Sequence, residues 1–368
     1  MPGGALWTEQ ETRIIAESVY LGESVDETAE RFAGRVPKRT RKTIQNRRSH
    51  ESVMEIVQRM RTGAEPAPRL FEVSTPAEES RVRPDELWTR AKEVTARQIR
   101  YQRDRHLAEV AFVTRKPIAL SFISDQHISQ GGAVDLEQME ADARLICETP
   151  GMFAVMGGDG VDNHLKHRAA LVNSGSVPGK EWVMYDHYLS MFGHKICGMI
   201  SGNHDDWTHD FAGIDMVQQL AERRRVFYAP DYIVMSVKLK ATPEDPGQEY
   251  VVKVRHQYRY SSSFNQTHSI KRLWEMDEHD FDIGVLCHHH EAAMEPFKKH
   301  GVWRYALRPG AYQITTGHSR RYGYARSEPM CPTVVIYPGT RRIVPFLDVR
   351  DAAVHLGAVR AITERAAA

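Results

Sequence analysis

Apolar residues near the start of the chain recur with the spacing of amphipathic helices. Within residues 7–62 this pattern predicts three helices, with breaks at Gly22 and Gly34 and a third helix over about 39–60. Thr8, with a Glu three positions later, is a capping-box signal for the start of the first helix. We therefore expect a small all-α domain over residues 7–62, or 1–62 with the leading residues included.

A second pattern begins at Pro117, where short apolar strands alternate with amphipathic helices. The predicted strands are Ile118–Ser124, Met152–Met156, Ile196–Ile200, Tyr250–Arg255, Phe281–Leu286 and Thr333–Tyr337. The predicted helices include Asp135–Glu148, Glu181–Phe192, Ile214–Arg225 and Thr267–Glu278. Such alternation predicts an α/β domain built in layers.

The segments that flank this second pattern complete the expected domain organisation. Residues 63–86 hold four prolines among Gly, Ala, Ser and Glu, which predicts a linker without a core. A basic helix over 87–107 follows, so we assign 87–350 to the α/β domain. For residues 351–368 we expect an Ala-rich tail.

Composition and charge exclude several classes of protein. Of the 368 residues, 41% are hydrophobic and 26% charged, as in an ordinary soluble protein. The 49 Lys and Arg nearly balance the 48 Asp and Glu, so any attraction to nucleic acid must be local. No apolar run approaches the ~18 residues of a membrane span, and the start of the chain lacks the pattern of a signal peptide. Four cysteines without CxxC spacing favour reduced thiols, and we expect a cytoplasmic protein with no membrane partner.

Polar residues with metal-binding chemistry follow five of the predicted strands. They are Asp125 and His127, Asp159 and Asp162, Asn203 to Asp205, His256, and His288 to His290. Ligands of α/β sheets bind outside the carboxyl ends of the strands, so we expect these side chains to lie together. An Asp-x-His pair recurs elsewhere in the chain and alone decides nothing, whereas the ordered set of five indicates a site.

The donor types in this set favour a particular class of metal. Carboxylates, one amide and several imidazoles suit Mn²⁺, Fe, Zn²⁺ or Ni²⁺ better than a Ca²⁺ cage or an iron–sulfur cluster. Two such ions ~3.5–4 Å apart share a bridging carboxylate and hold a solvent oxygen that attacks an electrophile in line. They also neutralise the oxygens of a phosphoryl group, which phosphoester hydrolysis requires.

The order of motifs DxH, GDxxD, GNHD, a single His and HxH resembles that of the calcineurin-like metallophosphoesterases, over roughly Pro117 to Asp348. The resemblance implies a layered sandwich of two mixed β-sheets flanked by helices and two divalent ions, for which we expect manganese, with iron, zinc and nickel as alternatives. It implies that Asp125, His127 and His290 bind the first ion, that Asp159 bridges both, and that Asn203, His256 and His288 complete the second. His204 is then an unligated general acid for attack by a metal-bound hydroxide, and Asp162 and Asp205 orient the ligands.

The sequence departs from this family at one tight position. Cys287 stands where relatives have Gly before the first His of the last motif, so the local backbone geometry is an open question. Residues i and i+2 of an extended segment share a side, which favours His288 and His290 over His289 as ligands.

The amino-terminal helices resemble a Myb/SANT-like helix-turn-helix, through Trp7, Glu11, the Gly22 break, and Gly34 before a basic helix. In that motif the third helix enters the major groove of DNA. The side chains expected there are Arg39, Arg41, Lys42, Gln45, Arg47 and Arg48. The alternative is a solvated basic face on a protein-binding bundle.

These features lead to three functional hypotheses. GNHD suits the DNA-repair exonuclease branch of the family and the cyclic-nucleotide branch alike, and the basic helix favours DNA. We therefore expect a metal-dependent phosphodiesterase or nuclease acting on DNA. The alternatives are a small-molecule phosphodiesterase or phosphatase, and a DNA-binding or assembly protein with a vestigial phosphoesterase domain. The sequence leaves the oligomeric state open.

Overall fold

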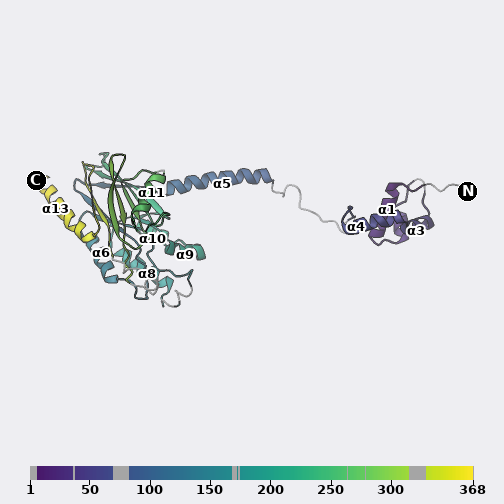
Figure 1. The fold of residues 1–368 in the computed structure, drawn as a ribbon, viewed down its shortest axis with the longest axis horizontal. Coiled ribbons are helices and arrows are strands. Elements are labelled where there is room, and N and C mark those ends of the chain that lie inside the picture. The colour runs from purple at the N-terminus through teal and green to yellow at the C-terminus, as the bar shows by residue number, and fades with distance from the viewer. Residues whose placement is uncertain are drawn as a thin grey trace. The chain divides into compact units, whose positions relative to one another are not determined.

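The computed structural model describes residues 6–35, 38–68, 83–167, 172, 175–262, 264–277, 279–314 and 329–367. The chain forms two compact units, Met1–Ala91 and Lys92–Ala368 (Figure 1). Most of the expected linker, residues 69–82, lies outside the described residues. The long helix α5 (Pro84–Arg105) contains the boundary between the two units.

The amino-terminal unit packs short helices around a core of its own. These helices are α1 (Glu9–Tyr20), α2 (Val25–Glu30), α3 (Arg41–Arg48) and α4 (Glu51–Thr62). The capping box is confirmed, because Thr8 Oγ1 accepts a hydrogen bond from Glu11 N at 3.2 Å and Glu11 Oε2 accepts one from Thr8 N at 2.9 Å. The single third helix over 39–60 is wrong. The chain breaks after α3, and the His50 ring caps a new helix by accepting from Ser52 N.

This break brings both halves of the expected third helix onto one core. One cluster completely buries Ile44 of α3, Val53 and Val57 of α4, and Ile15 of α1. Phe32 belongs to the same cluster and is almost completely buried. A straight helix could not turn both apolar stretches toward the same neighbours, because its residues rotate ~100° per position. Packing against α1 therefore overrides the continuous helical pattern.

A buried ion pair ties this unit together. Arg39 Nε and Nη2 each lie 2.8 Å from a carboxylate oxygen of Glu11, and the guanidinium lies 4.3 Å from the ring centroid of Trp7. The hydrogen bond from Arg39 lowers the pKa of Glu11 from 4.5 to about 2. A lowered carboxyl pKa contributes stability that is present above pH 4.5 and is lost as the pH falls toward 2.

Replacing Glu11 with Gln should therefore destabilise this unit by about 2 kcal/mol at neutral pH, because a charge-assisted hydrogen bond is lost. The substitution should also remove the loss of stability that the wild-type unit shows between pH 4.5 and pH 2. Hydrogen exchange of the α1 amides in the full chain measures both effects. Glu17→Gln is the matched control, because its 3.3 Å pair with Arg13 is partly exposed. Equal protection in Glu11→Gln and wild type at pH 7 would contradict the role of the pair.

The second unit contains two six-stranded sheets. The first has the strand order β12-β11-β2-β3-β4-β5 and the second β1-β6-β7-β8-β10-β9. The first comprises β2 (Ile118–Ile123), β3 (Met152–Met156), β4 (Ile196–Ile200), β5 (Phe227–Ala229), β11 (Thr333–Ile336) and β12 (Ile343–Phe346). The second comprises β1 (Leu107–Val113), β6 (Tyr232–Lys240), β7 (Gln248–Arg255), β8 (Ile283–Leu286), β9 (Ala293–Lys299) and β10 (Val302–Arg308).

Buried side chains join these sheets and helices into layers. One cluster contains inward residues of both sheets, such as Phe122 and Val155 of the first and Val252 and Val285 of the second. A second cluster packs helices onto the other face of the first sheet. These helices are α6 (Leu136–Glu148), α8 (Pro178–Ser190), α10 (Met216–Arg224) and α13 (Val349–Ala367). The helix α11 (His268–Met276) packs on the second sheet. The predicted sandwich of two mixed sheets flanked by helices is confirmed.

The carboxyl-terminal segment differs from the expected Ala-rich tail. It forms the helix α13, visible in yellow in Figure 1, in which Val349, Ala352 and Leu356 are buried. These positions lie three and seven residues apart on one face, so a small apolar stripe among alanines packs into the core. Residues 349–367 are therefore an integral layer of this unit.

The strand directions bring five strand ends to one edge. In the first sheet β2, β3 and β4 are parallel, and in the second sheet β7 and β8 are parallel. Each of these strands is followed by one of the polar motifs. Among the described residues, no helix has the length and apolar character needed to cross a membrane.

Candidate metal centre

Six of the seven predicted metal ligands lie together at this edge. Three groups of side chains have donor atoms within 4.8 Å of one another. They are Asp125, His127 and His290; Asp159, His256 and His288; and His127, Asp162 and His204. The first two correspond to the two ligand sets that the resemblance implied. Asn203, the remaining predicted ligand, begins the helix α9 (Asn203–Ala212) at the end of β4.

Most of these ligands occupy a backbone conformation that side chains rarely adopt. Five of them have positive φ angles, between 48° and 73°: Asp125, His127, Asp159, His288 and His290. Hydrogen bonds hold these turns, with Asp125 N donating to Gly158 O at 3.0 Å and His127 N donating to Asp159 O at 3.0 Å. Left-handed conformations in non-glycine residues cluster at functional sites, where the surrounding fold stabilises them.

In the first cluster, nitrogen and carboxylate atoms face one another. His290 Nε2 lies 3.0 Å from His127 Nε2 and 3.5 Å from Asp125 Oδ1. His127 Nε2 also lies 3.9 Å from Asp159 Oδ2. When His127 is neutral and its Nδ1–H donates to Asp162, its Nε2 carries a lone pair, and a cation beside His290 can accept it.

The second cluster surrounds the other side of Asp159. His256 Nε2 lies 3.1 Å from Asp159 Oδ2, while its Nδ1–H donates to Gly157 O at 2.8 Å. This bond directs Nε2 toward the carboxylate. Asp159 therefore stands between the two clusters, since the same Oδ2 faces His127 and His256.

Several of the predicted donor atoms accept or donate no hydrogen bond within the protein. Buried atoms without a hydrogen bond include Asp125 Oδ1, Asp159 Oδ2, Asn203 Oδ1, His256 Nε2 and His288 Nδ1. An unsatisfied buried polar atom costs free energy, and five that converge on one place need a common partner. Carboxylate, amide and imidazole donors fit divalent transition metals. The residues present therefore fit divalent metal ions.

The third group differs because its atoms are already paired. His127 Nδ1–H donates to Asp162 Oδ1 at 3.1 Å, and Gln313 Nε2 donates to the same oxygen at 3.2 Å. His204 Nδ1–H donates to the Asp162 carbonyl at 2.6 Å. Asp162 thus orients His127 through the ring nitrogen that faces away from the first cluster, as an outer carboxylate does for a metal-bound imidazole.

Asp205 connects the turn after β3 to the turn after β4. Its carboxylate accepts hydrogen bonds from the backbone nitrogens of Asp159, Gly160 and Gly202, at 2.7, 3.0 and 2.9 Å. Burial and the nearby charge of Asp159 raise the pKa of Asp205 to about 8. The structure thus places Asp205 behind the donor atoms, where it fixes the Asp159 backbone.

His204 lies beside the first cluster on α9. Its ring centroid is 4.7 Å from that of His127, and its backbone nitrogen donates to Asp159 Oδ1 at 2.8 Å. Because Nδ1 is engaged by Asp162, Nε2 is the atom available to a substrate. The ring centroid of Trp207 lies 4.2 Å from that of His204, and this contact restricts rotation of the imidazole.

The charges of the site shift the pKa values of its histidines in opposite directions. Burial opposes protonation of His127, but its bond to Asp162 and the charge of Asp159 raise its pKa to about 9. Burial likewise opposes protonation of His256, whose pKa the charge of Asp159 raises to about 10. Burial and the charge of His127 lower the pKa of His204 and His290 to about 4. The site therefore attracts positive charge toward Asp159.

Cys287 fits at the position where relatives have Gly. Its side chain is buried, and a Cβ added to Gly157 would lie 2.5 Å from its sulfur. The absence of a side chain at Gly157 therefore leaves room for the larger residue. His288 and His290 still reach the two clusters, whereas His289 belongs to none of the three groups.

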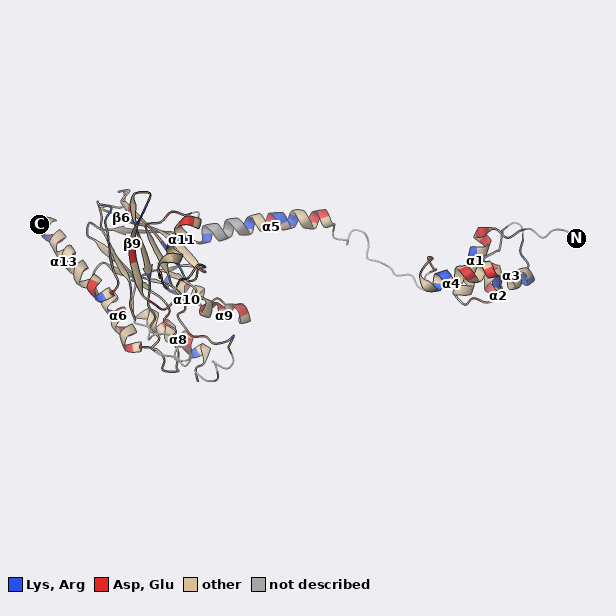
Figure 2. Ribbon diagram, viewed as in Figure 1, with Lys and Arg blue, Asp and Glu red and all other residues tan. Residues whose placement is uncertain are grey.

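The six residues expected to bind DNA divide into two sets in the amino-terminal unit. Arg39 pairs with Glu11, Arg47 donates to Thr12 and Ser52, and Arg48 donates to Thr28 and to the carbonyl of Glu23. These three arginines hold helices together. Arg41, Lys42 and Gln45 are exposed on α3, although Arg41 pairs with Asp26 at 2.9 Å, and Figure 2 shows the basic residues of this helix.

Sequence reasoning missed several residues that support the site. Asn163 Nδ2 donates to the His204 carbonyl at 2.6 Å, and its backbone nitrogen donates to the buried Glu181 at 2.8 Å. The ring of His164 stands 5.8 Å from that of His204. Trp207 follows His204 at the i+3 position, and this helical spacing was the signal that could have revealed their contact.

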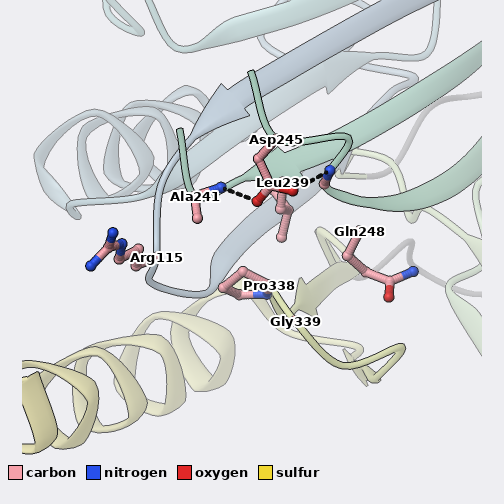
Figure 3. A pocket seen from close by; sticks show the side chains of 8 residues that line it. Arg115, Leu239, Ala241, Asp245, Gln248, Pro338 and Gly339 are labelled. Atoms are coloured by element: carbon pink, nitrogen blue, oxygen red, sulfur yellow. Dashed lines mark hydrogen bonds between the residues drawn. The ribbon is translucent and has the colours of Figure 1, made fainter. Parts of the chain in front are cut away.

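A cavity of about 410 Å³ lies elsewhere in this unit (Figure 3). It is lined by the β6–β7 turn, including Asp245 and Gln248, and by Pro338 and Gly339. Gln248 begins β7, whereas His256 follows its other end. The cavity and the metal centre therefore lie at opposite ends of this strand.

Comparisons with known proteins add little to this site. No protein-family model and no curated protein matches the chain. The solved structures that the chain resembles include a predicted phosphoesterase, a Vps29 and a metallophosphoesterase, each at low identity. A predicted phosphoesterase from Streptococcus pneumoniae is 15% identical, with 63% of this chain and all (100%) of that chain covered and a TM-score of 0.29. Vps29 with zinc from Entamoeba histolytica is 12% identical (62% and 98% covered, TM-score 0.31). A metallophosphoesterase from Sphaerobacter thermophilus is 12% identical (67% and 97% covered, TM-score 0.30). With values this low, the functional argument rests on the site residues.

Proposed function

We propose that this chain is a metal-dependent phosphoester hydrolase, and more narrowly a phosphodiesterase that cleaves DNA. The observation that carries the proposal is the set of buried donor atoms without a hydrogen bond on Asp125, Asp159, Asn203, His256 and His288. A buried arrangement of this kind has no role in packing. Two divalent ions at these residues would supply a Lewis acid that neutralises phosphoryl oxygens and activates water.

The protein's own residues have separate tasks in this reaction. Asp162 and the carbonyl of Gly157 orient the imidazoles of His127 and His256 through hydrogen bonds to Nδ1. Asp205 holds the backbone of Asp159. His204 presents Nε2 toward the substrate, and the negative charge of an arriving phosphodiester favours its protonated form. The imidazolium then donates a proton to the departing oxygen, a role typically worth 10²–10⁴-fold in rate.

DNA is the proposed substrate because of the exposed polar and basic residues on the amino-terminal unit. Arg41, Lys42 and Gln45 are exposed on one short helix. Such a surface fits phosphate contacts that raise the local concentration of substrate. Manganese is the metal that we propose, with zinc, iron or nickel as the alternatives that the same donors accept.

One panel tests the proposed function. Purified full chain is supplied with Mn²⁺, Mg²⁺ or Zn²⁺ and assayed on duplex DNA, single-stranded DNA, cyclic nucleotides, and aryl phosphate mono- and diesters. Metal-dependent cleavage of DNA and of the aryl diester supports the proposal. Cleavage of cyclic nucleotides or monoesters alone would favour the small-molecule alternative. No turnover with any metal would favour a binding protein with an inactive phosphoesterase domain.

Deleting residues 1–62 should leave hydrolysis of a small aryl diester intact and weaken DNA binding. The second unit has its own core and contains every proposed metal ligand. The salt dependence of DNA binding should also flatten, because exposed Lys and Arg contacts are lost. Titration of labelled DNA at several salt concentrations measures both effects. Unchanged affinity after deletion would refute DNA tethering by this unit and favour a protein-binding role.

A further inference from the structure

A ladder of alternating arginine and aromatic side chains begins beside the metal centre. We define the Tyr–Arg ladder as Arg255, Tyr258, Arg259, Tyr260 and Arg272. Arg255 lies 5.4 Å from the ring centroid of Tyr258, and Arg259 lies 6.0 Å from Tyr258 and 5.1 Å from Tyr260. Arg272 lies 5.3 Å from Tyr260 on the other side. Guanidinium groups and rings therefore alternate along one surface.

The ladder is joined to the site by sequence and by contact. Arg255 and Gln257 flank His256, one of the proposed metal ligands. The side chain of Gln257 lies 3.4 Å from His288 Nε2, another proposed ligand. A chain that occupied the ladder would therefore lead directly to the metal centre.

Tyr260 and Arg259 are the members of the ladder most available to a partner, whereas Tyr258 and Arg255 are half-buried. Tyr260 is 40% exposed and Arg259 is exposed. Among the described residues, no carboxylate lies within ion-pair distance (4.0 Å) of Arg255 or Arg259, whereas Arg272 pairs with Glu275. Phe264, on the same connecting segment, has a fully exposed side chain, which is unusual for a large apolar residue.

The segment is held in place rather than free to collapse. Tyr260 adopts a positive φ of 69°, which strains a non-glycine residue. Its carbonyl accepts a hydrogen bond from the buried Ser269 at 2.8 Å, and Arg255 Nε donates to the carbonyl of Gln257 at 2.8 Å. A strained, anchored conformation that leaves aromatic rings in solvent indicates a recognition surface.

We propose that the Tyr–Arg ladder binds a single-stranded polynucleotide and guides it to the metal centre. This inference rests on the proposed function and names the strand state of its substrate. Aromatic faces stack on bases, and arginines neutralise the phosphates between them. Bases of a duplex are already stacked inside the helix, so an exposed ring ladder selects unpaired strands.

The test measures binding of a labelled oligothymidylate of about 12 nucleotides to the full chain in EDTA, where hydrolysis does not proceed. Tyr260→Leu should weaken binding about tenfold, because one stacked base is lost. Arg259→Gln should weaken it as well and lower the salt slope by about 0.7, the value for one phosphate contact on a single strand. The affinity for a duplex of equal length should change less when Tyr260 or Arg259 is replaced.

The matched control is a second exposed aromatic–cation pair on the same unit. Lys298 lies 5.0 Å from the ring of Trp303, which is 52% exposed near the start of β10. That end lies roughly 17 Å along the strand from Arg308, whose charge interacts with that of Asp125 in the first cluster. Trp303→Leu and Lys298→Gln should leave oligonucleotide affinity unchanged. Loss of affinity equal to that of the ladder variants would show non-specific binding and overturn the proposal.

Photo-cross-linking locates the strand independently of affinity. An oligothymidylate that carries 5-iododeoxyuridine should cross-link to the peptide containing residues 258–264, with less product in Tyr260→Leu. Cross-links confined to residues 1–62, or unchanged affinity in both ladder variants, would overturn the inference. Thermal unfolding of Arg259→Gln should match that of the wild type. A weaker affinity in this variant is then an effect on binding and not on the fold.

The two proposals fail in different ways. If wild-type protein hydrolyses an aryl diester with metal while both ladder variants bind oligonucleotide normally, the ladder inference is wrong and the proposed function stands. If oligonucleotide binding depends on the ladder but no phosphodiester is hydrolysed with any metal, the proposed function is wrong.

Discussion

Asp159→Asn should abolish hydrolysis and remove at least one equivalent of bound metal. Asp159 Oδ2 is buried, accepts no hydrogen bond and faces the imidazoles of both His127 and His256. An amide in its place keeps the shape of the side chain but removes the negative charge that both ions would share. Residues that only orient ligands typically change metal affinity 10–100-fold, so loss of a shared ligand should exceed ~100-fold.

Metal content after dialysis, together with turnover of an aryl diester, measures this effect. Asp142→Asn is the matched control. Asp142, on α6, is also buried, but its carboxylate accepts hydrogen bonds from Tyr312 and Gln138. The control should keep its metal and its activity. Full metal occupancy with normal turnover in Asp159→Asn would refute the assignment of two metals to this site.

His204→Ala should keep both metals and the fold yet slow cleavage of DNA by about two orders of magnitude or more. The imidazole presents Nε2 beside the first cluster and is braced by Trp207 and by the carbonyl of Asp162. A protonated ring in this place supplies the proton that a departing alkoxide needs. A nitrophenolate departs without a proton, so an aryl diester should be slowed much less.

Comparing the two substrates in the same variant separates acid catalysis from binding. His209→Ala provides the control, since His209 lies exposed on the same helix α9. If His204→Ala loses metal, His204 is a ligand and the assignment is wrong. Equal slowing of both substrates would mean that His204 stabilises the phosphoryl charge instead of donating a proton.

Local pattern was sufficient for the elements whose apolar residues repeat clearly. The alternation of strands and helices from Pro117 onward predicted β2, β3, β4, β7, β8 and β11 within a few residues. It missed β1, β9 and β10, whose half-exposed faces mix charged and apolar residues, and β5, which has only three residues. It also missed β6 and β12. Pairing with a neighbouring strand stabilises such segments, and pairing is not visible in a local window.

The sequence by itself determined the donor set of the site. Each motif follows a strong strand, and the carboxyl ends of parallel strands meet at one edge, so the chemistry could be inferred without coordinates. Only the tertiary structure decided the roles of the surrounding groups. It showed that Arg39, Arg47 and Arg48 are used inside the amino-terminal unit and that Gly157 leaves room for Cys287. It also formed the Tyr–Arg ladder, in which Arg272 of α11 meets Tyr260 across a turn. These roles depend on contacts between residues distant in sequence, and composition and spacing carry no information about such contacts.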